Sequence, residues 1–350
     1  MDPQCRESCC VMRNAWQTLT CLSGRAAVIV HGPDGCGADL SLPGRRTSAT
    51  GLSEMDVVMG GEKALAAEIA GVRRRLRPDV IFVLGTCVSE IIGDDARGIC
   101  GQASRRLGLP VVFLPTSGMA EKGSGEPAAD AVLALVEQVM RPGRRIPDSV
   151  NLVAHPWPAY IGVREELAGR LAGLGIRLNA MLAGAPSLEE VVRAPRAALN
   201  LVVSDEPARR AALLMKERFG TPFLLVPRPL GVGAASRLLA LAAEAFGGGR
   251  RRAALVEAWR RYELRRLERE HPGLRGRTLR LDGRGPDPAA VQAFAELGIR
   301  LARSGARRGP ALQVRPPEAF LMYPGMHALA AELEAELGSG FFDKYGRYCR

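Results

Sequence analysis

Two of the eight cysteines lie at positions where α/β proteins place their chemistry. Cys36 follows the apolar run 26–30 within the glycine-rich segment HGPDGCG (31–37), and Cys87 follows the apolar run 80–84. Both runs have the composition of buried strands, so each cysteine is expected just past the carboxyl end of a strand. Ligands bind at that edge in open α/β sheets. Three or more thiolates that converge on one place in a cytoplasmic protein indicate an iron–sulfur cluster more than a disulfide, so such a cluster is expected at this edge.

Five further residues are expected to surround this cluster: His31, Gly32, Gly35, Gly37 and Thr86. The three glycines would let the backbone pass close to a bulky group and adopt positive φ. Backbone amides of HGPDGCG would then donate hydrogen bonds to the cluster sulfurs, which tune the reduction potential. His31 is expected to hydrogen-bond this loop rather than to bind metal.

Other polar and sulfur-containing residues nearby are expected to be structural. Asp94 and Asp95 would cap or flank the start of a helix, where a carboxylate is favourable. Cys100 lies on the helix-like segment that follows and is expected in the core. Cys349 is given no role.

The elements that must position these residues alternate along the chain. Short apolar runs bounded by Gly, Pro, His or Asp predict strands over 26–30, 80–84, 111–114, 150–153, 199–203 and 223–226. Apolar residues at three- and four-residue spacings predict helices over 61–76, 164–174, 207–219 and 234–246. This alternation predicts an α/β fold of repeated, doubly wound Rossmann-like domains with parallel sheets.

Two interruptions, the Pro- and Gly-containing segment 141–147 and the glycine triplet 247–249, are interpreted as linkers. They divide the chain into three expected domains: 1–147, which carries the cluster cysteines, 148–246 and 247–350. The third would contain a long charged helix, a short strand and one more helix, over 250–270, 278–282 and 289–297. An irregular Pro- and Arg-rich stretch follows, so this domain is expected to be shortened.

Charge and hydropathy exclude several classes of protein. The net charge is +11, and only four of the 48 basic residues are Lys. The arginines are spread through helix-like segments without interleaved aromatic residues, which argues against nucleic-acid binding. The positive net charge is instead expected to attract an acidic protein partner. No apolar run approaches the ~20 residues of a membrane helix, and MDPQCRESCC lacks the features of a secretory signal. A cytoplasmic protein with reduced cysteines is therefore expected.

Three segments resemble component 1 of nitrogenase and its relatives, a family of heteromeric reductases built on Rossmann-like domains. These segments are HGPDGCG (31–37), LSEMDVVMGGEKAL (52–65) and RPDVIFVLGTCVSEIIGDD (77–95), in the family's order and at about its spacing. A weaker likeness continues through 171–203 and 216–239 and fades after residue 300.

The resemblance implies a set of ligands and partners. Cys10, Cys36 and Cys87 resemble the three ligands that each subunit gives to an interfacial relay cluster, either an 8Fe-7S P-cluster or a 4Fe-4S centre. Cys9 and Cys21 remain alternatives to Cys10 as the third ligand. The implied partners are a homologous, longer α-type subunit in a heterotetramer and an ATP-dependent iron protein that passes electrons to the cluster one at a time.

The chain departs from the family's catalytic subunits after the first domain. No cysteine lies between Cys100 and Cys349, and no histidine in that interval lies in a recognisable cofactor motif. The histidines concerned are His155, His271 and His327. The chain therefore resembles the β-type subunit, which relays electrons and does not hold the substrate-reducing cofactor.

The shortened length and third domain argue against a standard nitrogenase β chain. Among the nitrogenase-like groups, the chain most resembles a methylthio-alkane reductase, which cleaves carbon–sulfur bonds and uses a P-cluster-type relay with cysteines from both chains. The alternatives are a tetrapyrrole reductase subunit, a nitrogenase β chain and a non-catalytic cofactor-assembly scaffold, which would hand on a precursor cluster without turnover. A degenerate sugar- or nucleotide-binding protein of the same fold would differ from all of these by containing no iron.

Overall fold

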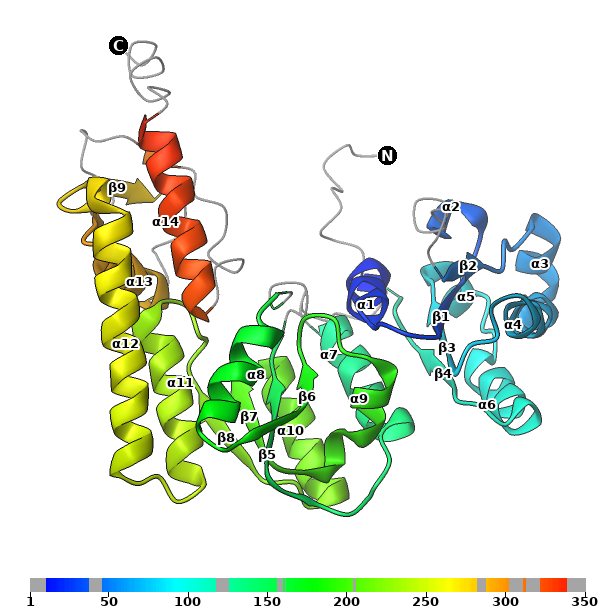
Figure 1. Cartoon of the computed structure of the whole chain (residues 1–350). Coiled ribbons are helices and arrows are strands. Elements are labelled where there is room, and N and C mark those ends of the chain that lie inside the picture. The colour runs from blue at the N-terminus through cyan, green and yellow to red at the C-terminus, as the bar shows by residue number, and fades with distance from the viewer. Residues whose placement is uncertain are drawn as a thin grey trace, which may run out of the picture.

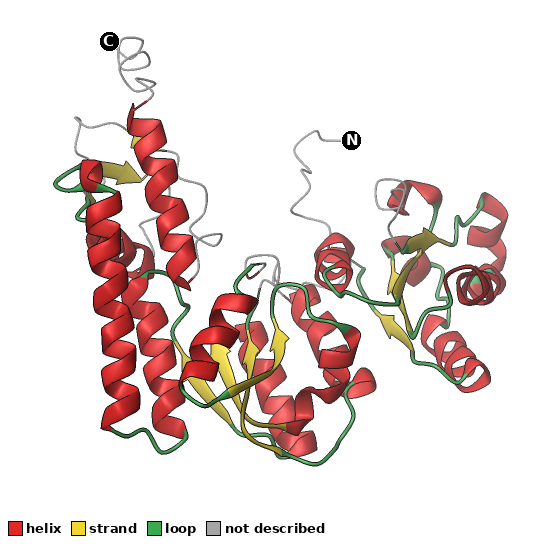
Figure 2. Cartoon of the chain, in the orientation of Figure 1, coloured by secondary structure: helices red, strands yellow, loops and turns green. Residues whose placement is uncertain are grey.

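The computed structural model describes residues 11–37, 46–117, 126–155, 160, 162–203, 206–281, 288–301, 311–312 and 322–338. These residues form three sheets flanked by helices, which follow one another along the chain in Figure 1 and Figure 2. Every strand pairing in the described part of the chain is parallel. The predicted α/β class with parallel sheets is confirmed.

The first sheet carries the candidate cluster cysteines. Its order is β2-β1-β3-β4, formed by Thr47–Ala49, Ala26–His31, Val80–Gly85 and Val111–Leu114. Successive residues of β1 and β3 enter two different hydrophobic clusters: Val28 and Phe82 face one, and Ile29 and Val83 face the other. This two-residue alternation is that of a strand buried on both faces, and it explains the uninterrupted apolar runs.

Helices cover both faces of this sheet. On one face lie α1 and α7, over Val11–Thr20 and Glu126–Ala134. On the other lie α4 and α6, over Glu62–Leu76 and Ala96–Leu107. Short helices α2, α3 and α5 follow the strands at the upper side of this sheet in Figure 1, over Asp34–Gly37, Glu54–Met59 and Cys87–Ile91.

The second sheet has the order β6-β5-β7-β8, formed by Arg177–Leu182, Ile146–Val153, Ala197–Val203 and Phe223–Val226. Its helices α8, α9, α10 and α11 span Arg164–Gly173, Leu188–Arg193, Glu206–Phe219 and Val232–Ala245. A buried amide chain crosses three strands: Asn179 donates to Asn151, and Asn151 donates to Asn200. The second sheet also shares a hydrophobic cluster with the first, since Val153 and Val202 join Trp16 and Phe82 in it.

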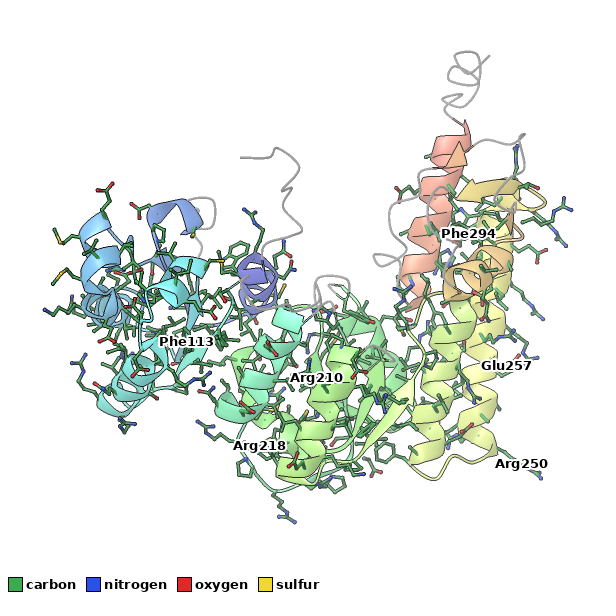
Figure 3. All side chains as sticks on the ribbon, turned by 180° about the vertical axis from the view of Figure 1, so that it is seen from behind. Phe113, Arg210, Arg218, Arg250, Glu257 and Phe294 are labelled. Atoms are coloured by element: carbon green, nitrogen blue, oxygen red, sulfur yellow. The ribbon has the colours of Figure 1, made fainter. Side chains whose placement is uncertain are left out.

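The third sheet is small, with the order β10-β9-β11 over Arg300–Leu301, Thr278–Leu281 and Ala311–Leu312. It is accompanied by α12, α13 and α14, over Arg250–Glu270, Pro288–Glu296 and Met322–Gly338. Phe294 of α13, labelled in Figure 3, is buried in the cluster that joins these helices to α11. The long helix predicted over 250–270 is confirmed, and α14 was not predicted.

Four of the described strands were not predicted, for local reasons: β2, β6, and the two-residue strands β10 and β11. β2 has only three residues, Thr47–Ala49, and β6 is broken by polar residues in RLNAML. β5 begins at Ile146, which pairs with Ala197, so the expected boundary between residues 147 and 148 falls inside this strand.

Within the described residues, no helix combines the length and the apolar character needed to cross a membrane.

Candidate functional site

The two predicted ligand cysteines follow neighbouring strand ends. β1 and β3 are adjacent, and their last residues, His31 and Gly85, lie opposite each other in register. Cys36 lies in α2, which follows β1, and Cys87 is the first residue of α5, which follows β3. The fold therefore brings both thiols to the carboxyl edge of the first sheet.

Thr86 ties these two segments together. Its backbone N–H and its hydroxyl both donate to the carbonyl oxygen of His31, at 3.3 and 2.9 Å. Its side chain also caps α5, accepting from the N–H of Ser89 while the Ser89 hydroxyl accepts from the N–H of Thr86. Thr86 thus fixes the start of the Cys87 helix against the end of β1.

The glycines of HGPDGCG differ in their roles. A Cβ on Gly32 would lie 2.4 Å from Oγ1 of Thr86, so only glycine fits there, but the φ of Gly32 is not positive. Gly35 has open space around it and no positive φ. The expected positive φ is therefore wrong for these two residues, and the constraint on Gly32 is the close approach of Thr86. Gly37 ends α2.

His31 is fully buried, and both of its ring nitrogens contact residues of other loops. Its Nε2 lies 2.9 Å from an Asp94 carboxylate oxygen, and its Nδ1 lies 3.2 Å from the Thr50 hydroxyl. Thr50 in turn bonds both the N–H and the C=O of Gly32. Burial lowers the pKa of His31, outweighing the opposite effect of Asp94. His31 therefore supports the loop through Thr50 and is not directed at a metal.

The two adjacent aspartates divide their roles. Asp95 caps α6, accepting from the N–H of Gly98 at 2.8 Å, as predicted. Asp94 instead pairs with His31 and accepts from the N–H of Gly61 at 2.9 Å. Sequence reasoning missed this pairing because His31 and Asp94 are 63 residues apart.

The described cysteines differ in burial and position. Cys36 is half-buried and packs against the hydrophobic cluster that includes Met12 and Trp16 of α1, whereas Cys87 is exposed. Cys100 is buried in α6, and burial raises its pKa to about 12, which opposes formation of a thiolate. Its predicted place in the core is confirmed.

Cys21 lies at the other edge of the first sheet. It follows α1 and precedes β1, so it is near the amino end of a six-residue strand that spans about 20 Å. Burial also raises its pKa. Cys9 and Cys10, and also Cys349, lie outside the described residues.

An exposed apolar patch, defined by Met55, Val58, Met59 and Ile91, lies on α3 and α5. Their exposed fractions are 68, 79, 76 and 68%. No residue of α3 is buried, and a Ser53–Asp56 capping box holds its amino end. The bond between Asp94 and Gly61 links the loops that follow the two helices. The sequence segment 52–65 already indicated this exposed patch, because it places several apolar residues on a helix too short to bury them all.

The histidines after Cys100 lie elsewhere. His155 follows β5, and burial lowers its pKa. His327 of α14 lies beside His271, which directly follows α12, and both contact carboxylates. Sequence reasoning did not associate these two residues.

A family model described as nitrogenase component 1 type oxidoreductase matches residues 10–315. Three curated relatives are each called nitrogenase iron-molybdenum cofactor biosynthesis protein NifE. The protein from Methanococcus maripaludis is 29% identical over 308 residues, 81% of this chain and 62% of that protein. Those from Nostoc sp. and Clostridium pasteurianum are 31 and 33% identical, over 57% of this chain and 44 and 45% of theirs. The chain thus spans 44 to 62% of these relatives.

Two solved structures of nitrogenase Cp1 share the fold. The structure at pH 6.5 superimposes with a TM-score of 0.71 and 20% identity, covering 88% of this chain and 65% of the other. For the structure at pH 5 the TM-score is 0.70 and the identity 21%, with coverage of 92 and 70%.

Proposed function

This chain belongs to the nitrogenase component 1 type oxidoreductase family, and within that family we propose that it is a subunit of a cofactor-assembly scaffold. In this role it would hold an iron–sulfur cluster at the carboxyl edge of its first sheet, between itself and a homologous, longer partner chain. A precursor cofactor would be carried by the complex and handed on without substrate turnover.

The similarity to NifE proteins carries this proposal. All three relatives described above are named as proteins of iron–molybdenum cofactor biosynthesis. The sequence alone favoured methylthio-alkane reduction and kept assembly as an alternative, so these relatives support the alternative better than the first interpretation. Tetrapyrrole reduction and a nitrogenase β chain gain no comparable support from them.

The donor set at the carboxyl edge fits an iron–sulfur cluster. Cys36 and Cys87 follow adjacent strands, and thiolates are the usual ligands of such clusters. The bonds of Thr86 to His31 hold the two cysteine segments in a fixed relation. When bound, the cluster would supply one-electron redox chemistry, and the residues of this chain would position it and exclude water from its buried side.

The course of α1 favours Cys10, with Cys9 next, over Cys21 as the third ligand. The indole N–H of Trp16 donates to the Thr47 hydroxyl at 3.1 Å, and Thr47 pairs with Val28 in the middle of β1. From residue 21 back to Trp16, α1 therefore runs from the amino end of β1 to a position beside the middle of β1. At about 1.5 Å per residue, the remaining turns lead on toward the carboxyl edge.

The exposed apolar patch is the part of this edge most suited to docking. Apolar side chains gathered on a short helix beside a functional edge are typical of protein interaction sites. We assign this patch to the ATP-dependent iron protein, because an electron donor must approach the cluster closely. The net charge of +11 would assist an acidic partner.

Cluster transfer tests the proposed function. The chain is co-expressed with its partner, purified without oxygen, loaded with precursor cofactor and mixed with a cofactor-deficient component 1. Activation of the acceptor, with no reduction of methylthio-alkanes or tetrapyrroles by the complex itself, is expected. Turnover of either substrate class with iron protein and ATP, and no transfer, would show that the complex is a reductase.

Iron analysis tests the ligand assignment separately. Cys36→Ala and Cys87→Ala are each expected to remove the cluster signal, whereas the core variant Cys100→Ala should keep it. Equal iron loss in all three variants would contradict the division into ligands and core.

A further inference from the structure

Two histidines meet where the carboxyl end of α12 packs against α14. His271 directly follows α12, and His327 lies in the second turn of α14. Their ring centroids are 5.8 Å apart, and the rings are tilted by 50°. The residues come from segments 56 positions apart in the sequence, so only the tertiary fold brings them together.

Each ring is oriented by a carboxylate on its outer side. Nδ1 of His271 lies 2.9 Å from Oε2 of Glu334, and Nε2 of His327 lies 3.4 Å from Oε2 of the buried Glu263. Histidines that bind metals are usually held in this way, by a carboxylate on the nitrogen that does not touch the ion. The remaining nitrogens are Nε2 of His271 and Nδ1 of His327.

The remaining nitrogen of His327 is buried and lacks a hydrogen-bond partner within the described structure. It lies 3.4 Å from Oε2 of Glu270. One ring nitrogen of each histidine and one carboxylate oxygen of Glu270 all lie within 4.8 Å of one another. Around a tetrahedral ion with bonds of about 2.0–2.1 Å, neighbouring donor atoms are about 3.4 Å apart.

The charges around the two histidines favour a bound cation. Four carboxylates surround the histidines, against three guanidinium groups: Glu166, Glu263, Glu270 and Glu334, and Arg170, Arg266 and Arg269. Arg269 lies 3.6 Å from Oε1 of Glu270, so one negative charge remains in excess. Arg170 is engaged with Glu166 and Glu263, and it stacks on Tyr323 and Trp259. Arg266 contacts Glu270 from solvent at 3.0 Å, and it would have to release one carboxylate oxygen to an ion.

We propose that Glu270, His271 and His327 bind a divalent transition-metal ion of the zinc class, with solvent as the fourth ligand, and that Glu334 and Glu263 orient the two rings. Two imidazoles and one carboxylate are a donor set that zinc favours. The ion would join the end of α12 to α14, and so stabilise the third unit, independently of the cluster at the first sheet.

Zinc retention by the full chain tests the proposal. The protein is treated with a chelator, given zinc chloride, desalted and analysed for zinc and iron together. Cysteines without a cluster also bind zinc, so all forms carry Cys36→Ala and Cys87→Ala. One zinc ion per chain is expected in this background, and none after adding His271→Ala or His327→Ala. Glu334→Gln should weaken zinc binding by about 10–100-fold.

Glu257→Gln is the matched control, because Glu257 is a half-exposed carboxylate on the same helix that pairs only with Arg260 and Arg261 among the described residues (Figure 3). It should retain zinc. Zinc should also raise the melting temperature of the parent and of this control, but not of the histidine variants. Equal zinc in the parent and in His327→Ala, or no zinc in the parent, would overturn the proposal. Because this readout needs no iron, it is separable from failure of the proposed function.

Discussion

The hydroxyl of Thr86 donates to the carbonyl oxygen of His31 at 2.9 Å, across the ends of two adjacent strands. This bond brings the Thr86 side chain against Gly32, where a Cβ would lie 2.4 Å from Oγ1. The segment that carries Cys36 and the helix that starts at Cys87 are thereby held in one fixed geometry. Loss of this contact should weaken binding of the proposed cluster without changing either thiol.

Gly32→Ala tests this relation. The added methyl group must push Thr86 aside, and overpacking of this kind costs about 1–3 kcal/mol of the free energy of unfolding. Lower iron content per chain and a lower melting temperature are expected. Gly35→Ala is the control, since nothing lies within 4 Å of a Cβ there and φ is not positive. If both variants lost iron equally, steric contact with Thr86 would not be the reason for Gly32.

The third ligand can be assigned by a pair of cysteine variants. Cys10→Ala is expected to remove most of the cluster iron, whereas Cys21→Ala should retain it, because Cys21 lies at the amino end of β1. Iron analysis and the electron paramagnetic resonance spectrum of the reduced complex provide the readout. If Cys10→Ala retained iron and Cys9→Ala lost it, Cys9 would be the third ligand. Loss of iron in Cys21→Ala would contradict the assignment based on the course of α1.

Protonation of His31 should destabilise the first sheet at acid pH. Burial lowers its pKa in the folded chain, so the unfolded chain binds the proton more tightly. The stability that depends on neutral His31 is complete above the unfolded pKa of about 6.5 and is lost as pH falls below it. The difference in unfolding free energy between the wild type and His31→Gln should therefore shrink from pH 8 to pH 5.

His155 and His327 have pKa values shifted in the same direction as that of His31. The pH dependence of wild-type stability alone therefore does not identify which histidine is responsible. The comparison with His31→Gln isolates it. A difference that is independent of pH would mean that His31 does not titrate in this range.

The exposed apolar patch should affect docking more than folding. Val58→Glu and Met59→Glu place a charge on side chains that are 79 and 76% exposed, so the change in stability should stay within about 0.5 kcal/mol. ATP-dependent electron transfer from the proposed iron-protein partner should fall, while iron content stays constant. Leu213→Glu introduces the same charge at a 47% exposed position on α10, away from this edge, and should leave the transfer rate unchanged. Equal effects at both places would argue against a docking role.

The sequence by itself determined the α/β class, most strands of the first two sheets and the edge at which Cys36 and Cys87 lie. These features follow from local patterns, because a strand buried on both faces is a continuous apolar run and the next residue leaves at its carboxyl end. Family membership, too, was present in contiguous motifs. Cys100 could also be placed in the core from a local pattern, because its helix has one apolar face.

The tertiary structure alone decided which distant groups meet. Thr86 against Gly32, Asp94 with His31, and His271 beside His327 are pairs separated by more than fifty residues, and no local pattern encodes them. Cys21 and Cys36 are close in sequence, yet β1 puts them at opposite edges of the sheet. Packing also determined that short or polar segments such as β2 form strands. Their residues have little intrinsic preference for a strand and become extended only by pairing with a neighbouring strand such as β1.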